Sequence, residues 1–433
     1  MKESSIISLR WGDKMKLVEL SKTEFNEFTN YLEICPFEQS IYWANFKSGE
    51  NWHPYFLGLE DKNKLLGATL LLANENKSIK KRFFYAPQGF LIDYKNYDLL
   101  EVFTKEIINF VKEKNGIYLK IDPEILTTEK DENGKKLQGG INNLFIKDYL
   151  LKLGFIETDN NTINPKYTMK LDLTDKSLND ILNNMSKKAR QIIKRNERLG
   201  YIVRELKQDE LPIFIKTMDK ISSKFNTIEY ELPFYEDLAS AFTNEHLKIM
   251  IAELDLNTTL NNLKKEEKVL QIEKEKRIGL YQNNQLTEET FIEKELGYKE
   301  QINIINKRRK YYLSLKEKTD NDKIFLGGYL FLMYGKEITA LIGGMDDEYI
   351  DLDVSYSIHF KMLKKAIEYG YRSYNFYEVK DVNDGGFFFK QNFGAKLFEH
   401  IGEFDYPIDL NSYKKYKKYF PLYYGVKSVY KNK

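Results

Sequence analysis

A polar segment without proline, from Leu254 to Lys318, constrains the fold of this 433-residue chain more than any other feature. Lysine, glutamate, asparagine, glutamine and leucine dominate it, and apolar side chains recur along both halves at intervals close to those of a coiled coil. These side chains are Leu256, Leu260, Leu263, Leu270, Phe291, Tyr298, Ile302, Ile305 and Tyr312. Because the turn signal Asn283-Asn284 separates the halves, the pattern predicts an antiparallel helical hairpin over residues 254–320, in preference to one solitary charged helix.

The remaining sequence alternates short strand patterns with amphipathic helix patterns, which is typical of α/β proteins. A chain of this length is too long for a single hydrophobic core, so we expect more than one domain. The element order near the N-terminus recurs in outline later, which predicts two related α/β halves. We place them at 16–165 and 166–395, with 396–433 packing back on the first half and 1–15 as a loose extension.

Composition excludes several classes of protein. A single cysteine, Cys35, rules out an internal disulfide framework and favours a reducing compartment, and the four scattered histidines lack the spacing of metal ligands. No apolar run approaches the ~20 residues that cross a bilayer, and no signal peptide is visible. We therefore expect a cytoplasmic protein without a metal. The acid-free tail from Tyr413 to Lys433 suits contact with phosphate or lipid headgroups.

The stretch from Gly385 to Phe404 contains the first candidate site residue. Three phenylalanines, Phe387 to Phe389, run directly into Lys390, and a loosely alternating strand pattern covers Lys396 to Phe404. A cation on a rigid apolar support costs desolvation free energy and calls for an anionic or polarised partner. The alternative is that Lys390 extends to the surface while its stem covers the aromatic rings.

Two further candidates are an acid and a basic helix face. Asp122 follows a predicted strand at 117–121, where an acid could serve a site or simply cap the next turn. The predicted helix after Ser186 places four cations on one face, namely Lys187, Arg190, Lys194 and Arg198. The net charge of +2 gives no general attraction for polyanions, so such a face is either solvated or meets an anion locally.

Seven stretches, taken together and in order, carry a resemblance. They are QSIYWANFK (39–47), FYAPQGFLIDY (84–94), YLKIDP (118–123), the basic helix (186–200), SYSIHFKMLKKAIEYG (355–370), YNFYEV (374–379) and FFFKQNFGAKLFEHIGEFDYPI (387–408). The chain resembles the Fem family of peptidoglycan aminoacyltransferases (the FemA, FemX and MurM group) from residue 16 to about residue 424. This resemblance implies two tandem GNAT-like acyltransferase domains, with the coiled-coil arm inserted in the second.

The resemblance also implies an activity. Such enzymes move Gly, Ala or Ser from aminoacyl-tRNA to the stem-peptide amine of a peptidoglycan precursor, either lipid II or UDP-MurNAc-pentapeptide, and so build the interpeptide bridge. The tRNA is a co-substrate, and no cofactor is implied. A peripheral contact with the inner face of the membrane and a monomeric or homodimeric state are compatible with this activity.

Single residues receive roles from the same resemblance. Lys390 falls on the lysine of the family's Phe-Lys motif, which polarises the ester carbonyl and supports the oxyanion, and Phe389 stands beside it in the substrate site. Lys47 falls on the lysine that meets the precursor's diphosphate. Asp122 falls on the acid of the Ile-Asp-Pro turn near the acceptor. Lys224 replaces a phosphate-binding arginine of the family and lacks its bidentate fork.

The resemblance assigns Lys187, Arg190 and Lys194 to tRNA binding. Two rival classes remain. An acetyl-CoA-dependent GNAT acyltransferase needs a pyrophosphate-binding loop that the nearest string, 391–396, does not match. A non-catalytic adaptor for tRNA or coiled coils is disfavoured because both lysines of the Fem motifs are retained.

Overall fold

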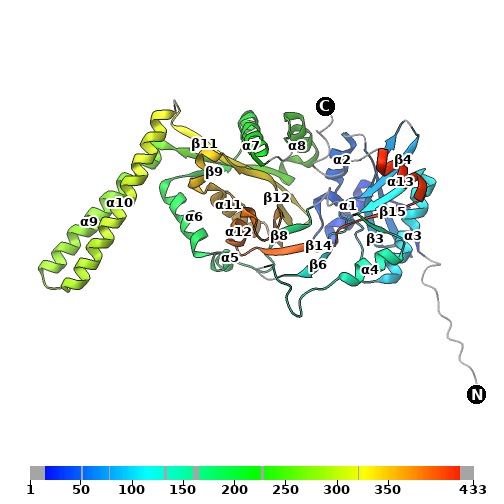
Figure 1. Ribbon diagram of the computed structural model, residues 1–433, viewed down its shortest axis with the longest axis horizontal. Coiled ribbons are helices and arrows are strands. Elements are labelled where there is room, and N and C mark those ends of the chain that lie inside the picture. The colour runs from blue at the N-terminus through cyan, green and yellow to red at the C-terminus, as the bar shows by residue number, and fades with distance from the viewer. Residues whose placement is uncertain are drawn as a thin grey trace, which may run out of the picture.

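A computed structural model describes residues 15–49, 52–77, 79–130, 134–158, 165–225, 229–319 and 321–419. Two mixed sheets with helices on their faces stand side by side, and a pair of long helices projects from the far end of the second (Figure 1). This is the predicted α/β class with a helical arm. The expected N-terminal extension up to residue 14, and the tail beyond residue 419, lie outside the described residues.

The first sheet has seven strands in the order β1-β2-β3-β4-β5-β15-β7. Their bounds are β1 Lys16–Glu19, β2 Trp52–Asp61, β3 Lys64–Asn76, β4 Lys81–Ala86, β5 Gly116–Ile121, β15 Glu403–Pro407 and β7 Ile156–Thr158. Helices α3 (Tyr97–Glu113) and α4 (Leu144–Lys152) cover one face, and α1 (Lys22–Tyr31), α2 (Ile41–Gly49) and α13 (Leu410–Tyr419) contribute to the core on the other. In each segment, apolar side chains recur with the period of a helix or of a strand, so one face of the segment is apolar and faces the core.

The second sheet has eight strands in the order β6-β14-β8-β13-β12-β11-β10-β9. Their bounds are β6 Leu126–Glu129, β14 Lys396–His400, β8 Tyr167–Asp172, β13 Ser373–Val379, β12 Glu337–Met345, β11 Lys323–Tyr334, β10 Leu247–Asp255 and β9 Ile202–Glu205. One face packs on α6 (Lys187–Leu199), α11 (Val354–Glu368) and α12 (Gly385–Gln391), with α5 (Leu178–Asn184) beside them. The opposite face packs on α7 (Leu211–Phe225) and α8 (Leu232–His246), whose core continues into the first sheet.

The two sheets exchange strands, which the sequence did not predict. The expected strand from Lys396 to Phe404 is divided, because Gly402 turns the chain at φ +105°. β14 pairs with β8 in the second sheet, whereas β15 pairs with β5 in the first. The prediction that all of 396–433 packs on the first half is therefore wrong for β14. In addition, β6, from the first predicted half, joins the second sheet through β14.

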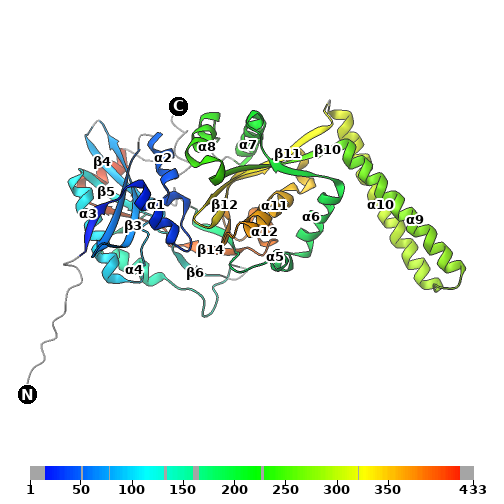
Figure 2. The ribbon, with the colours of Figure 1, turned by 180° about the vertical axis from the view of Figure 1, so that it is seen from behind.

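The projecting arm consists of α9 (Leu256–Gln282) and α10 (Glu288–Lys318), which run antiparallel (Figure 2). At the tip, Tyr281 stacks on Phe291 with ring centroids 4.4 Å apart. At the base, apolar side chains of both helices are buried in the core of the second sheet, and they include Leu263, Ile305 and Tyr312. The arm is thus anchored at its base and solvated along its length. Within the described ranges, no helix is both long and apolar enough to cross a bilayer.

Anchoring of the arm base can be tested by a matched pair of substitutions. Ile305 is 4 % exposed and Ile292, on the same helix, is 50 % exposed. We expect Ile305→Ala to lower the free energy of unfolding by about 2–4 kcal/mol, because it leaves a cavity, and Ile292→Ala to change it by less than about 0.5 kcal/mol. Urea unfolding measures both. Equal effects would show that the arm base does not belong to the core.

Candidate active site

Lys390 lies near the end of the short helix α12, which Asp384 caps by accepting a hydrogen bond from the backbone N–H of Gly386. Its Nζ donates to the carbonyl oxygens of Tyr377 (3.3 Å) and Glu378 on β13. The side chain is directed back onto the sheet and does not extend into solvent. Burial lowers the pKa of Lys390 to about 8, although the carboxylates of Asp384 and Glu378 oppose this shift. The ammonium is therefore a poorly solvated cation held by fixed dipoles.

A bulge in β13 brings those carbonyl groups to the lysine. β13 runs parallel to β12 for three residue pairs that end at Thr339↔Asn375. Its register with β8 then shifts between Asn375 and Glu378. Tyr377 lies in this bulge with a left-handed φ of +63°, which is unusual for a bulky side chain. Such local distortion is common beside functional sites, and here it presents carbonyl oxygens to a single cation.

The aromatic run before Lys390 is helical, so its members face different directions. Phe387 is buried, Phe388 is 53 % exposed, and Phe389 packs against His359 with ring centroids 5.5 Å apart. Burial, together with the nearby Lys390, lowers the pKa of His359 to about 3, so that its imidazole is neutral. Phe389 thus belongs to an aromatic cluster behind Lys390. Its contact with a substrate stays a prediction.

Lys47 occupies a different environment from Lys390. Its side chain is fully buried on α2, and its Nζ lies 5.3 Å from the ring centroid of Trp43 and 5.8 Å from that of Trp52. Aromatic faces stabilise a cation. A phosphate in solvent cannot reach this ammonium as it lies, so the predicted diphosphate contact would require a rearrangement. Lys47 lies in the aromatic core and Lys390 at the bulge of β13.

Asp122 lies directly after β5 and holds the preceding loop in place. One carboxylate oxygen accepts a hydrogen bond from the hydroxyl of Tyr85 (2.9 Å), and the other accepts one from the backbone N–H of Gln88 (2.8 Å). The two oxygens therefore bind Tyr85 of β4 and the loop just after that strand, which is a different segment from the turn that the sequence suggested. A catalytic role for Asp122 stays a prediction.

The basic face of α6 is only partly free. Lys187 and Lys194 are exposed and form no ion pair among the described residues, whereas Arg190 donates to the carbonyl of Leu182 at the end of α5 (2.9 Å). Lys224 lies apart from this face, at the end of α7, and pairs with Asp347 (2.8 Å). Lys187 and Lys194 therefore keep the charge available for an anion.

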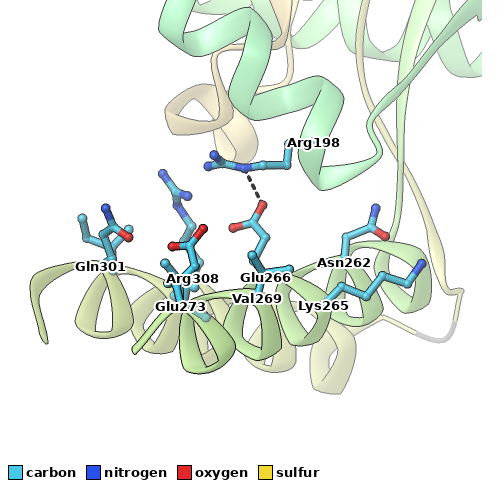
Figure 3. A pocket seen from close by; sticks show the side chains of 11 residues that line it. Arg198, Asn262, Lys265, Glu266, Val269, Glu273, Gln301 and Arg308 are labelled. Atoms are coloured by element: carbon cyan, nitrogen blue, oxygen red, sulfur yellow. Dashed lines mark ion pairs between the residues drawn. The ribbon is translucent and has the colours of Figure 1, made fainter. Parts of the chain in front are cut away.

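A groove of about 630 Å³ lies between the end of α6 and the arm (Figure 3). Arg198 reaches across to Glu266 of α9 and forms an ion pair with it. Arg308 of α10 also lines the groove, and burial, together with the cations Arg195 and Arg198, lowers its pKa. The groove also contains the acids Glu266 and Glu273, so its three cations, Arg198, Lys265 and Arg308, are largely balanced. The groove is therefore a mixed polar surface, and the uncompensated charge lies on the exposed face of α6.

A buried polar cluster between the sheets was not predicted from the sequence. Lys170 of β8 forms ion pairs with Glu124, which follows β5, and with Glu337 of β12. The two acids, but not Lys170, line a cavity of about 20 Å³, whose walls are Pro36, Phe37, Glu38, Gln88, Glu124, Pro165, Thr168, Glu337, Thr339, Asn375, Tyr377 and His400. The members of this cluster come from segments that are distant in the sequence, so no local motif indicates it. The one available signal was the position of acids directly after predicted strands.

The two mixed sheets agree with the comparisons with known proteins. The chain belongs to the FemAB family, whose model matches residues 20–419. It is 27 % identical to the aminoacyltransferase FemA of Staphylococcus epidermidis (93 % of this chain, 98 % of the relative) and 25 % identical to that of Staphylococcus aureus (93 % and 97 %). The crystal structure of FemX matches with a TM-score of 0.73 at 19 % identity, over 93 % of this chain and 99 % of that one. The protein is thus an aminoacyltransferase of this family.

The lowered pKa of Lys390 predicts a pH-dependent contribution to stability. The ordinary lysine value is 10.5, so between about pH 8 and pH 10.5 the unfolded chain binds a proton that the folded chain has released. Stability therefore rises with pH in this window. Relative to Lys390→Met, the wild type should gain up to about 3 kcal/mol across it. Urea unfolding at several pH values measures the difference. The exposed Lys396→Met is the control, and parallel curves for Lys390→Met and wild type would contradict the assignment.

Proposed function

We propose that this protein transfers an amino acid from aminoacyl-tRNA to the stem-peptide amine of a peptidoglycan precursor and so builds the interpeptide bridge. The observation that carries the proposal is Lys390, a poorly solvated cation held on two backbone carbonyls in a protein whose relatives are named aminoacyltransferases. An ester carbonyl develops negative charge when an amine attacks it. A preorganised ammonium stabilises that oxyanion most effectively where little water competes.

The chemistry is direct aminolysis. The neutral acceptor amine attacks the ester carbon, the ammonium of Lys390 stabilises the resulting oxyanion, and the bond to the 3′-terminal ribose oxygen of the tRNA breaks. Because the pKa of Lys390 is about 8, its charged form persists at neutral pH and declines above that value. We assign Gly, Ala or Ser as the transferred residue and lipid II or UDP-MurNAc-pentapeptide as the acceptor, at the cytoplasmic side of the membrane. The exposed lysines of α6, Lys187 and Lys194, suit the tRNA backbone.

Replacing Lys390 tests the proposed chemistry. We expect Lys390→Met to reduce transfer from charged tRNA to a muropeptide by about 10²–10³-fold, the range found when an oxyanion donor is removed. The measurement is amide product formed from radiolabelled aminoacyl-tRNA, with acetyl-CoA as an alternative donor. Lys396→Met, at an exposed site on β14, is the control. Near wild-type turnover of Lys390→Met would remove this lysine from the mechanism, and transfer only from acetyl-CoA would favour the rival enzyme class.

The salt dependence of tRNA binding tests the basic face. The double variant Lys187→Gln/Lys194→Gln should weaken binding, and should reduce the slope of log K against log salt by about 0.7–0.9 for each phosphate that the variant no longer neutralises. The control is Lys105→Gln/Lys112→Gln, which removes two exposed lysines with the same seven-residue spacing from α3. Fluorescence titration at several salt concentrations measures the slope. Equal slopes for all three proteins would place the tRNA elsewhere.

A further inference from the structure

The cavity between the two sheets contains an acid that the mechanism above does not use. Glu38, in the short 3₁₀ turn Phe37–Gln39 before α2, is 6 % exposed and lines this cavity. Among the described residues, no other residue donates a hydrogen bond to its carboxyl group or forms an ion pair with it. Its carboxyl group does accept a hydrogen bond from the backbone N–H of Glu38 itself, but one such bond compensates little of the desolvation of a buried carboxyl group. Glu38 therefore differs from the other acids of the cluster.

The other acids are already paired. Glu337 accepts hydrogen bonds from Ser373 (2.6 Å) and Asn375 (3.0 Å) as well as from Lys170. Burial alone would raise the pKa of Glu337, but these partners outweigh it and lower the pKa, so Glu337 remains ionised. His400 bonds Thr168 (2.8 Å), and burial lowers its pKa to about 3, so it carries no charge. Among the described residues of this cluster, Lys170 is therefore the one cation, whereas Glu38, Glu124 and Glu337 supply three carboxyl groups. A second cation could pair with Glu38.

Size and access also fit a small cationic group. A volume of about 20 Å³ admits one group the size of a water molecule, and an ammonium head is of that size. The cavity shares the wall residues Pro36, Gln88 and Glu124 with an open groove of about 550 Å³. That groove is lined largely by apolar side chains, which include Leu91 and Ile92. A flexible aliphatic side chain lying in the groove could thus extend its terminal amine into the cavity.

The cavity adjoins the proposed oxyanion site. Tyr377 lines the cavity, and its backbone carbonyl accepts a hydrogen bond from Lys390. The Glu38 carboxyl group is also among the charges that raise the pKa of the Tyr377 hydroxyl, after burial itself. One residue therefore separates the cavity from the ammonium that would stabilise the oxyanion. In contrast, both oxygens of Asp122 already accept hydrogen bonds, from the hydroxyl of Tyr85 and from the backbone N–H of Gln88.

We propose that the cavity between the sheets binds the primary ammonium group of the acceptor side chain, and that Glu38 is the base that takes its proton. This inference rests on the proposed function and deepens it by naming the acceptor site. It also moves the role expected of Asp122 to a residue that the sequence did not single out. The described residues contain no group of three His, Cys, Asp or Glu side chains arranged to hold a metal ion, so the acids do not form a metal site.

The acceptor ammonium enters beside the Glu38 carboxylate, and one proton passes from nitrogen to carboxylate oxygen, which leaves a neutral amine and a neutral carboxylic acid. Burial raises the pKa of Glu38 well above its ordinary value, because the opposing hydrogen bond from its own backbone N–H is outweighed and the charges of Glu124, Asp122 and Glu337 add to the rise; its carboxylate is therefore a stronger base. The amine attacks the ester carbon, its second proton passes to the departing ribose oxygen, and Glu38 later releases its proton to solvent.

The test uses Glu38→Gln, which keeps the size of the side chain and removes its ability to accept a proton. We expect transfer to a muropeptide bearing a lysine amine to fall by about 10²-fold or more. Transfer to the same muropeptide bearing an aminooxy group should stay close to wild type, because that nitrogen is already neutral at neutral pH. The control is Glu33→Gln, an exposed residue of the preceding loop that pairs with Arg372.

The outcomes separate this inference from the proposed function. An active wild type with an equally active Glu38→Gln would overturn the role of Glu38 alone. Loss of transfer to both acceptors in a folded Glu38→Gln would also overturn it, because a merely structural defect affects both. A wild type inactive with every charged tRNA would overturn the proposed function and this inference with it. Rescue by the aminooxy acceptor alone supports the proposal.

The pH profile gives a second readout. In the wild type, kcat/KM for the amine acceptor should rise with pH as Glu38 ionises. We expect this ionisation to be missing from the profile of Glu38→Gln and to be present in that of Glu33→Gln. Titratable or charged groups that face Glu38 or its cavity, and that could contribute to the limb, are Cys35, Tyr85, Asp122, Glu124, Lys170, Glu337, Tyr377 and His400. An unchanged limb in Glu38→Gln would overturn the assignment.

Discussion

The ion pairs of Lys170 with Glu124 and Glu337 are the interaction on which the rest of the structure depends. Lys170 and Glu337 belong to the second sheet, and Glu124 follows a strand of the first. Burial alone would lower the pKa of Lys170, but the two carboxylates raise it, so the lysine remains charged. Removing one member of a buried ionic cluster leaves the charges of the other members unpaired, which is costly. The cluster therefore constrains how the two sheets approach each other. The bulge that holds Lys390 lies on a strand of the same cluster.

A second lysine plays a comparable part within the first sheet. Lys120 of β5 is buried and pairs with Glu403 (3.2 Å) and Asp405 (2.9 Å) of β15. Charged side chains facing each other across adjacent strands specify which strands become neighbours, since a shifted register would leave them unpaired. In each sheet a buried lysine thus pairs with two acids, and distant segments supply them: β15 supplies both partners of Lys120, and β12 supplies Glu337 to Lys170. Apolar patterning alone would not distinguish these pairings from others.

The sequence predicted the elements with short-range signals. The spacing of its apolar residues and the turn signal Asn283-Asn284 predicted the helical arm. The alternation of strand patterns with helix patterns predicted the α/β class of fold. What the sequence could not predict was set by contacts between distant residues. The division of strand 396–404 depends on partners more than 200 positions away, and the cavity that Glu38 lines has walls from β12 and β13, which are distant in the sequence. Likewise, nothing in the Lys47 motif indicated that its ammonium would face tryptophan rings.

The exchange of strands between the sheets has a consequence for synthesis on the ribosome. β15 lies between β5 and β7 in the first sheet, yet its residues, Glu403–Pro407, are translated long after those two strands. Until they emerge, the first sheet lacks an inner strand, and Lys120 lacks both of its carboxylate partners. All eight strands of the second sheet precede codon 403, so a transcript truncated just before it would leave the first sheet incomplete and the second sheet with all of its strands.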